Sequence, residues 1–522
     1  MSKEHPINNI VIVGGGTAGW LTAALLGAEF AENDQGIRIT LIESPGTPPI
    51  GVGEGTWPSM RSTLKKIGLS ETLFFTECEA TPKQGTWFKG WLHGADETYY
   101  HPFTLPTGFS EINLAEYWLN GEAGNVSFAE AVTPQFAVCE QGLAPKQISV
   151  PEYAFTLNYG YHLDAGRFAS LLQKHAVETL GISHILDDVI AIENDSDGDI
   201  AAVQTQHHGA ITGQLFVDCS GFRSLLLGEH FDIPMRPQKQ VLFNDRALAV
   251  QVPYSKPEDA IASATRSTAQ AHGWIWDIGL QHRRGVGYVH ASDYCSEDEA
   301  RTVLDKYLRA TGCQNGVDDL TVRTLTFEPG YREKFWHRNC VAIGLSAGFI
   351  EPLEASALVL VELSARALAE QMPVNRSAMD IIARRFNSEF SARWEQIIDF
   401  LKLHYVLSKR SDTAYWTDNR DEATWPDSLR ERLDLWRFQC PWHRDDRNRD
   451  DMFPAASYQY ILYGMDFKTQ TTLGLKRDAQ KTQARADALF SECRQLSQRY
   501  TKGLPPSRQL MQQVRKQGFA KL

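Results

Sequence analysis

The chain has 522 residues, of which 43% are hydrophobic and 22% are charged, as expected of a globular protein with a large core. Its 64 acidic and 52 basic side chains give a formal net charge of -12, which argues against a general affinity for nucleic acid or anionic membranes. The eight cysteines form no CxxC pair and no metal-ligand spacing, so we expect reduced thiols, a cytoplasmic location and no metal site.

The N-terminal segment has the pattern of a βαβ unit. Residues 10–13 predict a strand, residues 17–30 a helix and residues 37–43 a second strand. Residues 10–28 carry no charge, but three consecutive glycines, residues 14–16, interrupt them after only four β-branched residues. A strand, a turn and a helix therefore fit this segment better than a membrane span.

Between the first predicted strand and the helix, residues 14–19 match the dinucleotide-binding motif GxGxxG. Its glycines permit a tight turn and let a pyrophosphate approach the helix N-terminus, whose N–H groups favour anions. Glu43 ends the next strand and can accept hydrogen bonds from the adenosine ribose. The motif alone also allows a glycine turn without a ligand. The residues assigned to the cofactor here are Gly14, Gly16, Thr17, Ala18, Gly19 and Glu43.

Two later segments favour FAD over NAD. Residues 216–221 and 341–348 each resemble a strand that runs into a turn of small residues, and Gly344 and Gly348 belong to the second turn. An extended flavin needs a remote backbone turn for its ribityl and isoalloxazine end, and both segments resemble such turns in glutathione-reductase-like flavoproteins. Because no second GxGxxG motif follows, we expect no separate NAD(P)H domain.

The sequence pattern changes near residue 377. Before it, short apolar runs such as residues 183–192 and 247–252 are separated by many turns, as in an α+β substrate region. After it, long stretches with helical periodicity, such as residues 377–403 and 477–500, predict helices.

These patterns predict an α/β (α+β) fold. Residues 1–376 are expected to form a glutathione-reductase-like, Rossmann-type FAD-binding domain with an inserted substrate region, and residues 377–522 a helical C-terminal region that completes the substrate site. Ser377, with Asp380 three residues later, predicts the start of the first C-terminal helix. The basic residues after 506 are expected to be loosely ordered.

Several motifs in order along most of the chain resemble those of the flavin-dependent tryptophan halogenase family. Residues 51–58 resemble its GVGEaTxP stretch, and residues 274–279 resemble its WxWxIP signature with Gly279 in place of proline. The remaining matches are residues 14–20, residues 77–83 with the family's essential lysine, residues 349–354 with its essential glutamate, and the stretch that includes His404, Tyr405, Asp412, Thr413 and Trp416. Several separate motifs in order are more specific than any one of them.

The resemblance implies a halogenase that depends on FADH2 and oxygen. In the family's chemistry, the reduced flavin and oxygen convert a halide, chloride or bromide, into hypohalous acid, which halogenates an electron-rich aromatic ring. The implied substrate is tryptophan, indole or a related indole, and the implied partner is a separate NAD(P)H-dependent flavin reductase that supplies FADH2. The sequence is also compatible with a homodimer.

The same resemblance assigns the catalytic residues. Lys83 matches the essential lysine, whose ammonium can hydrogen-bond hypohalous acid or whose neutral amine can form a haloamine. Its alternative is a solvated surface lysine, the fate of most lysines. Glu354 matches the essential glutamate, which can stabilise a cationic ring and take its proton. Glu351 is the local alternative, either carboxylate could instead stabilise a helix N-terminus, and Ile350 is assigned to the cofactor.

Two further features follow from the matched motifs. Trp274 and Trp276 alternate on a predicted strand and so share one face, where the resemblance makes them a wall beside the flavin and core packing is the alternative. Glu-Ala-Ser-Ala, residues 354–357, replaces the family's Glu-Ser-Thr-Gly. The resemblance places the halide on the backbone amides of Ser356 and Ala357, and alanine is strained at the last position if that position needs a positive φ.

Two other functions stay open. A flavin-dependent aromatic monooxygenase shares the FAD fold and hydroxylates its substrate directly, but Lys83 and the two tryptophans favour a halogenase. A non-catalytic flavoprotein would leave the lysine and glutamate motifs unexplained. Residues 442–463, which are rich in aromatic side chains, are the candidate for gripping the substrate, and a free or a carrier-bound aromatic fits equally well.

Overall fold

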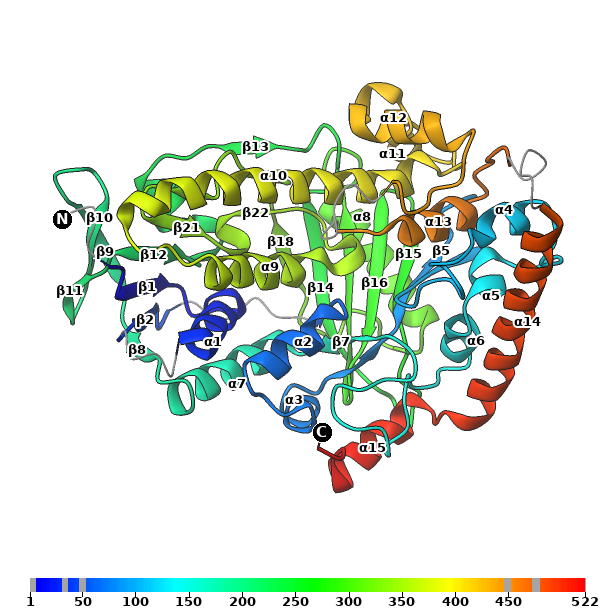
Figure 1. The fold of residues 1–522 in the computed structure, drawn as a ribbon, viewed down its shortest axis with the longest axis horizontal. Helices are drawn as coiled ribbons and strands as arrows, with labels where there is room; N and C mark the ends of the chain where they lie inside the picture. Colours follow the sequence, from blue (N-terminus) through cyan, green and yellow to red (C-terminus); the bar gives the residue numbers. More distant parts are fainter. Residues whose placement is uncertain (1–5, 31–35, 47–52, 446–451, 472–478, 522) are drawn as a thin grey trace. The chain divides into compact units, whose positions relative to one another are not determined.

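The computed structural model describes residues 6–30, 36–46, 53–445, 452–471 and 479–521. Figure 1 shows the chain coloured by sequence position, with its helices and strands labelled. The chain divides into two compact units, each assembled from three stretches. The first unit comprises Met1–Glu79, Leu163–Gln238 and Glu328–Trp394, and the second comprises Ala80–His162, Lys239–Phe327 and Glu395–Leu522.

A six-stranded sheet with the order β20-β21-β12-β1-β2-β8 forms the centre of the first unit. Its strands are β1 (Asn9–Val13), β2 (Arg38–Glu43), β8 (Ser183–Leu186), β12 (Leu215–Asp218), β20 (Trp336–His337) and β21 (Cys340–Ala342). β1 pairs in parallel with β2 and β12, and residues 10–13 are all buried, as in a parallel strand covered on both faces. The long helices of this unit are α1 (Thr17–Phe30), α7 (Ala165–Glu178) and α9 (Ser356–Glu370).

The predicted βαβ unit is confirmed. Helix α1 has the predicted bounds, and β2 begins one residue later than predicted. α1 packs against α7 and α9, and the buried side chains of its middle turns hold it in the unit's core. The glycine turn therefore lies between the central strand of a parallel sheet and a buried helix.

Shorter elements complete the first unit. They are the antiparallel sheet of β9 (Val189–Asn194), β10 (Ile200–Thr205) and β11 (Gly209–Thr212), the sheet of β13 (Met235–Pro237), β19 (Gly330–Arg332) and β22 (Gly348–Phe349), the two-residue strand β3 (Glu54–Gly55), and helices α2 (Ser59–Lys66) and α3 (Glu71–Glu77). The short apolar run of residues 183–192 thus contributes to two strands, β8 and β9, in different sheets.

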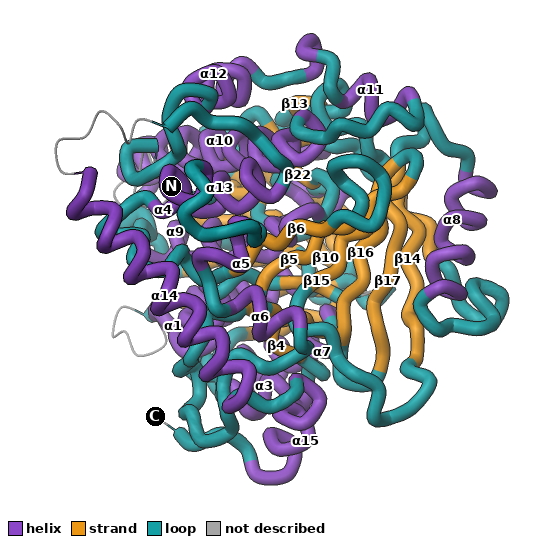
Figure 2. Tube along the Cα trace, turned by 90° about the vertical axis from the view of Figure 1, so that its right-hand side faces the viewer, coloured by secondary structure: helices purple, strands orange, loops and turns teal. Residues whose placement is uncertain are grey.

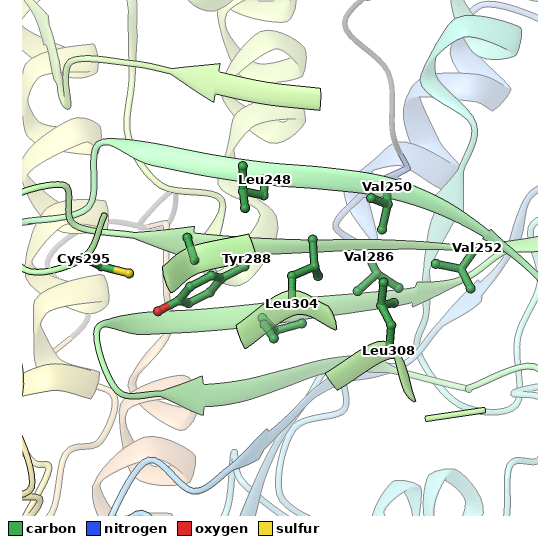
Figure 3. Packing of buried hydrophobic residues seen from close by; sticks show 10 residues of the cluster. Leu248, Val250, Val252, Val286, Tyr288, Cys295, Leu304 and Leu308 are labelled. Carbon is green, nitrogen blue, oxygen red and sulfur yellow. The ribbon is translucent and has the colours of Figure 1, made fainter. Parts of the chain in front are cut away.

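A seven-stranded sheet with the order β18-β14-β17-β16-β15-β5-β6 dominates the second unit (Figure 2). Its strands are β5 (Gly85–Lys89), β6 (Thr98–Pro102), β14 (Arg246–Pro253), β15 (Thr265–Gln270), β16 (Gly273–Gly279), β17 (Arg283–His290) and β18 (Arg323–Thr326). Helix α8 (Glu297–Ala310) covers β14 and β17, and its Leu304 and Leu308 pack on Leu248, Val250 and Val286 (Figure 3). These residues alternate along the strands, so each strand turns one apolar face to the helix.

The second unit also contains the short paired strands β4 (Thr81–Lys83) and β7 (Gly160–Leu163) and many helices. Those helices are α4 (Leu114–Leu119), α5 (Phe128–Val132), α6 (Gln135–Glu140), α11 (Ala414–Asn419), α12 (Asp427–Trp436), α13 (Ala455–Gly464), α14 (Ala479–Gly503) and α15 (Ser507–Gln517). Among the described residues, no helix is both long and apolar enough to cross a membrane.

The C-terminal region differs from the expectation in two details. Helix α10 (Arg376–Val406) begins near the predicted start, but Asn375 rather than Ser377 caps it, because the Asn375 side chain accepts a hydrogen bond from Ala378 N–H at 2.9 Å. The expectation of loose order after residue 506 is wrong, since α15 occupies this segment.

The two compact units do not divide the chain as the predicted domains do. Their last boundary lies inside α10, between Trp394 and Glu395, and the stretches of the two units alternate along the chain. The functional division into residues 1–376 and 377–522 stays a prediction.

Candidate active site

The glycine turn between β1 and α1 has two positions that packing restricts to glycine. Gly14 has a φ of 121°, and a Cβ there would lie 2.1 Å from the carbonyl oxygen of Cys219. A Cβ on Gly19 would lie 1.9 Å from the carbonyl oxygen of Gly14. These two glycines let the turn, the helix and the end of β12 approach one another closely.

Gly16 differs from its neighbours. No atom of the described part of the chain lies within 4 Å of a Cβ built on it. Internal packing therefore does not account for a glycine there, whereas an approaching pyrophosphate at the N-terminus of α1 would. Thr17 begins this helix, and its hydroxyl donates a hydrogen bond to the Ala165 carbonyl at 3.4 Å. The turn fits the phosphate end of a dinucleotide such as FAD.

Glu43 lies at the end of β2, beside the turn. A Cβ on Gly15 would come 2.2 Å from the Glu43 carboxyl carbon, so the glycine makes room for this side chain. His184 on β8 places its Nε2 at 3.0 Å from Glu43 Oε2. The carboxylate thus lies against the turn, where the adenosine ribose is expected.

The two predicted flavin-side turns adjoin one another. β12 and β21 pair in parallel, with Asp218 opposite Ala342. The fully buried Asp218 carboxylate accepts hydrogen bonds from the hydroxyls of Ser220, at 2.5 Å, and Ser346, at 3.1 Å. Asp218 therefore ties the turn after β12 to the turn that contains Gly344. Asp218 is not among the residues predicted from the sequence, although its position at a strand end before small residues is a signal.

Gly344 and Gly348 are explained by close packing around the turn. Gly344 has a φ of 77°, and a Cβ there would lie 2.7 Å from the Ala18 Cβ. A Cβ on Gly348 would lie 2.6 Å from the Gly330 carbonyl oxygen. Ile350, the third residue assigned to this end of the cofactor, is buried. The turn after β21 thus lies against the first turn of α1.

The segment before α9 carries an unusual backbone. Glu354 and Ala355 have φ values of 65° and 58°, in the left-handed region that side chains other than glycine rarely adopt. The indole N–H of Trp57 donates to the Glu354 carbonyl oxygen at 2.8 Å and stabilises this turn. Such strain, of order 1–3 kcal/mol per residue, persists where the surroundings fix the backbone. The strain expected at Ala357 therefore falls two residues earlier, because α9 begins at Ser356.

Both candidate carboxylates of this segment are nearly inaccessible to solvent. Glu354 is 5% exposed and Glu351 is 1% exposed. Two further acidic groups in the first unit were not predicted. Burial raises the pKa of Glu54 to about 7, and it also raises that of Glu362 to about 7. Glu362 lies on α9 and accepts a hydrogen bond from the Thr63 hydroxyl at 2.6 Å. Within the motif that contains Glu54, residues 51 and 52 lie outside the described residues.

Lys83 ends β4 in the second unit and is 1% exposed, so the alternative of a solvated surface lysine is wrong. Its Nζ lies 5.3 Å from the ring centroid of Phe103. β4 pairs with β7, and burial together with the charge of Lys83 holds the pKa of the neighbouring His162 well below its usual value. A neutral imidazole and an aromatic ring therefore lie near the lysine.

Trp274 and Trp276 lie on β16 and are both buried, with ring centroids 6.4 Å apart. Gly287 on β17 makes room for the second ring, because a Cβ there would lie 2.1 Å from Trp276. Core packing is thus one role of these tryptophans. The Thr81 hydroxyl donates to the Gly279 carbonyl at 2.6 Å and joins the lysine strand to the end of the tryptophan strand.

Comparison with known proteins decides the family. Residues 9–480 match the family described as tryptophan halogenase. The chain belongs to the tryptophan halogenase family. It is 50% identical to a tryptophan halogenase from Shewanella frigidimarina NCIMB 400, whose crystal structure matches over 100% of both chains with a TM-score of 0.96.

Two other members of this halogenase family are more distant. Tryptophan 6-halogenase SttH of Streptomyces toxytricini is 34% identical over 489 residues, which cover 89% of this chain and 90% of the relative. The structure of Tar14, a tryptophan C-6 flavin-dependent halogenase from taromycin biosynthesis, is 31% identical and matches 97% of this chain and 100% of its own with a TM-score of 0.89.

These similarities confirm the predicted fold class, cofactor and enzyme class. The protein is a flavin-dependent halogenase that uses FAD and halide and works with a separate flavin reductase and an aromatic substrate. The hydroxylase and the non-catalytic flavoprotein are not supported. The roles of individual residues stay predictions, and the structure places Glu354 and the FAD-binding candidates in the first unit and Lys83, Trp274 and Trp276 in the second.

Proposed function

We propose that this halogenase acts on tryptophan or a related small indole and that Lys83 delivers the halogen. The observation that carries the proposal is the burial of Lys83 beside the Phe103 ring, because most lysines are exposed and this one, 1% exposed, matches the family's essential lysine. The relatives named tryptophan halogenases support the substrate class. Residues 442–463 are proposed to grip the substrate, with α13 among them and residues 446–451 outside the described residues.

Bound as FADH2, the cofactor supplies, with oxygen, the oxidation of halide to hypohalous acid. Lys83 then holds this oxidant by a hydrogen bond from its ammonium. As the ring carbon forms a bond to the halogen, the bond between oxygen and halogen breaks, and the oxygen leaves as water with a proton from Lys83. Glu354 stabilises the cationic ring and accepts the proton from the substituted carbon. The Trp274 and Trp276 pair is proposed to keep the substrate away from the flavin.

The remaining assignments follow from backbone position. Ser356 and Ala357 open the fifteen-residue helix α9, where N–H groups have no acceptor within the helix, so we assign the halide to their amides. FAD is held by the turn with Gly14, Gly16, Thr17, Ala18 and Gly19, by Glu43, and by Gly344, Gly348 and Ile350.

All eight cysteines are free thiols, which supports a cytoplasmic location. A homodimer is a further expectation that size-exclusion chromatography tests.

Gly16→Val should abolish FAD binding and leave the apoprotein folded. The added side chain meets no described atom within 4 Å at its Cβ but occupies the proposed path of the pyrophosphate. The measurement is FAD affinity by flavin fluorescence, together with the Tm of the apoprotein. Gly19→Ala is the control that shows the effect of a packing defect in the same turn. Its Cβ would clash with the Gly14 carbonyl oxygen, so this variant should have a lower Tm. Native FAD affinity in the Gly16 variant would show that the site is wrongly assigned.

The function is tested by reconstitution with a separate NADH-dependent flavin reductase. Tryptophan and a panel of indoles are offered with FAD, oxygen and bromide or chloride, and products are identified by mass spectrometry. We expect a halogenated product only when both halide and reductase are present. Because one GxGxxG motif occurs in the chain, the pure protein with FAD and NADH should oxidise NADH negligibly. A hydroxylated product without halide, or rapid NADH oxidation by the protein alone, contradicts the proposal.

A further inference from the structure

The C-terminal helix α15 is packed into the second unit. Leu510, Met511 and Val514 of this helix are buried, as is Ser507 at its first position. The helix contacts β4, the strand that ends at Lys83. The segment is therefore part of the framework around the proposed catalytic lysine.

One set of hydrogen bonds connects α15 to the residue that precedes β4. Arg515 Nε donates to Gln281 Oε1 at 2.5 Å, and the Arg508 guanidinium donates to the Gln281 carbonyl oxygen. The Gln281 side chain, 3% exposed, donates in turn from Nε2 to the Ala80 carbonyl oxygen at 2.8 Å. Gln281 lies in the turn between β16 and β17, and Thr81 donates to Gly279 at the edge of that turn. The start of β4 is thus fixed by a side chain that α15 holds.

A second set of hydrogen bonds reaches the residue after Lys83. The Ser507 hydroxyl lies 2.9 Å from that of Ser263. The Ser263 carbonyl oxygen accepts a hydrogen bond from the backbone N–H of Gln84 at 2.9 Å. The Gln84 side chain and the Ser263 hydroxyl both donate to the Leu143 carbonyl at 2.8 Å. Both ends of the short lysine strand are therefore connected to α15.

We propose that Gln281 and α15 are positioning elements that hold Lys83 where it retains hypohalous acid and passes it to the substrate. The inference deepens the proposed function and rests on it. A three-residue strand cannot fix its own register, and displacement of a reacting group by about 1 Å can cost a hundredfold in rate. Gln281 supplies the donor to Ala80 because its amide has both an N–H and a carbonyl, and a carboxylate in its place would only accept.

The decisive variant is Gln281→Glu, which can still accept from Arg515 but cannot donate to the Ala80 carbonyl. Product and released oxidant are measured per FADH2 oxidised, with free methionine converting released hypohalous acid into detectable sulfoxide and catalase removing hydrogen peroxide. We expect the ratio of halogenated product to sulfoxide to fall about tenfold or more. FADH2 oxidation and the sum of product and sulfoxide should stay at the parent level, which a general loss of structure would not permit.

Arg515→Ala, at an exposed position, keeps the inference testable if the buried variant fails to fold. It should shift the same ratio in the same direction, Arg515→Lys should restore part of it, and Lys516→Ala on the same exposed turn should leave it unchanged. An unchanged ratio in both Gln281→Glu and Arg515→Ala overturns the inference and leaves the proposed function standing. A parallel fall of total oxidant and Tm in Arg515→Ala also overturns the inference and leaves the proposed function standing. Full halogenation by Lys83→Ala would instead overturn the proposed function and the inference with it.

Discussion

Lys83→Ala should abolish the halogenated product, while FAD binding and oxygen consumption by the reduced flavin stay at the parent level. The FAD-binding candidates belong to the first unit, whereas Lys83 ends β4 in the second. The lysine is proposed to act on hypohalous acid after it forms, so its loss leaves oxidant formation intact. The measurement is product yield per FADH2 oxidised, in bromide and with tryptophan or the substrate that the screen identifies.

Two control variants make this result specific to the ammonium. Lys83→Met keeps much of the buried volume without the charge, so it should be as inactive as Lys83→Ala if the charge or the amine is required. Lys89→Ala removes an exposed lysine of β5, the next strand along the chain, and should keep full activity, because Lys89 pairs with Asp96 on the surface. Halogenation by Lys83→Ala at the parent rate would remove Lys83 from the mechanism.

The parts of the fold that sequence predicted correctly are those with local signals. The strand, glycine turn and helix of residues 9–30 combine a β-branched run, three glycines and a long apolar helix, and the structure confirms them almost residue for residue. The alternation of Trp274 and Trp276 likewise placed both on one strand. In each case the pattern depends on neighbours within a few residues.

The features that sequence did not predict depend on distant residues. The two compact units interleave three stretches each, and no local pattern records which stretches pair. Asp218 gains its role from Ser346, which is 128 residues away. The left-handed backbone at Glu354 and Ala355 is stabilised by Trp57 from another segment. The replacement of the family's glycine by Ala357 therefore could not predict where this backbone lies. The basic composition after residue 506 predicted loose order. Composition does not show that Arg508 and Arg515 bind Gln281, in the turn between β16 and β17.

Glu354→Gln should lower halogenation on the order of a hundredfold or more, because one change removes both a stabilising charge and a proton acceptor. The amide keeps the shape of the side chain, and the turn is held through the Glu354 backbone carbonyl, to which Trp57 donates at 2.8 Å. FAD binding and FADH2 oxidation should therefore stay near the parent level. The measurement is product formation in a single turnover. A scavenger removes hypobromous acid that is free in solution, so that only halogenation by the enzyme is counted.

Glu351→Gln is the matched control, since Glu351 lies three residues earlier in the same segment and is buried as well. If Glu354 alone faces the reacting ring, the Glu351 variant should keep most of the parent rate, and the hundredfold loss should belong to Glu354→Gln. A solvent-viscosity series under steady-state turnover separates chemistry from product release, because the rate becomes independent of viscosity when the chemical step limits it. The opposite ranking of the two variants would transfer the role to Glu351, and equal, small losses would mean that neither carboxylate takes the ring proton. In that last case the left-handed turn would serve to aim the first N–H groups of α9, at Ser356 and Ala357, toward the halide.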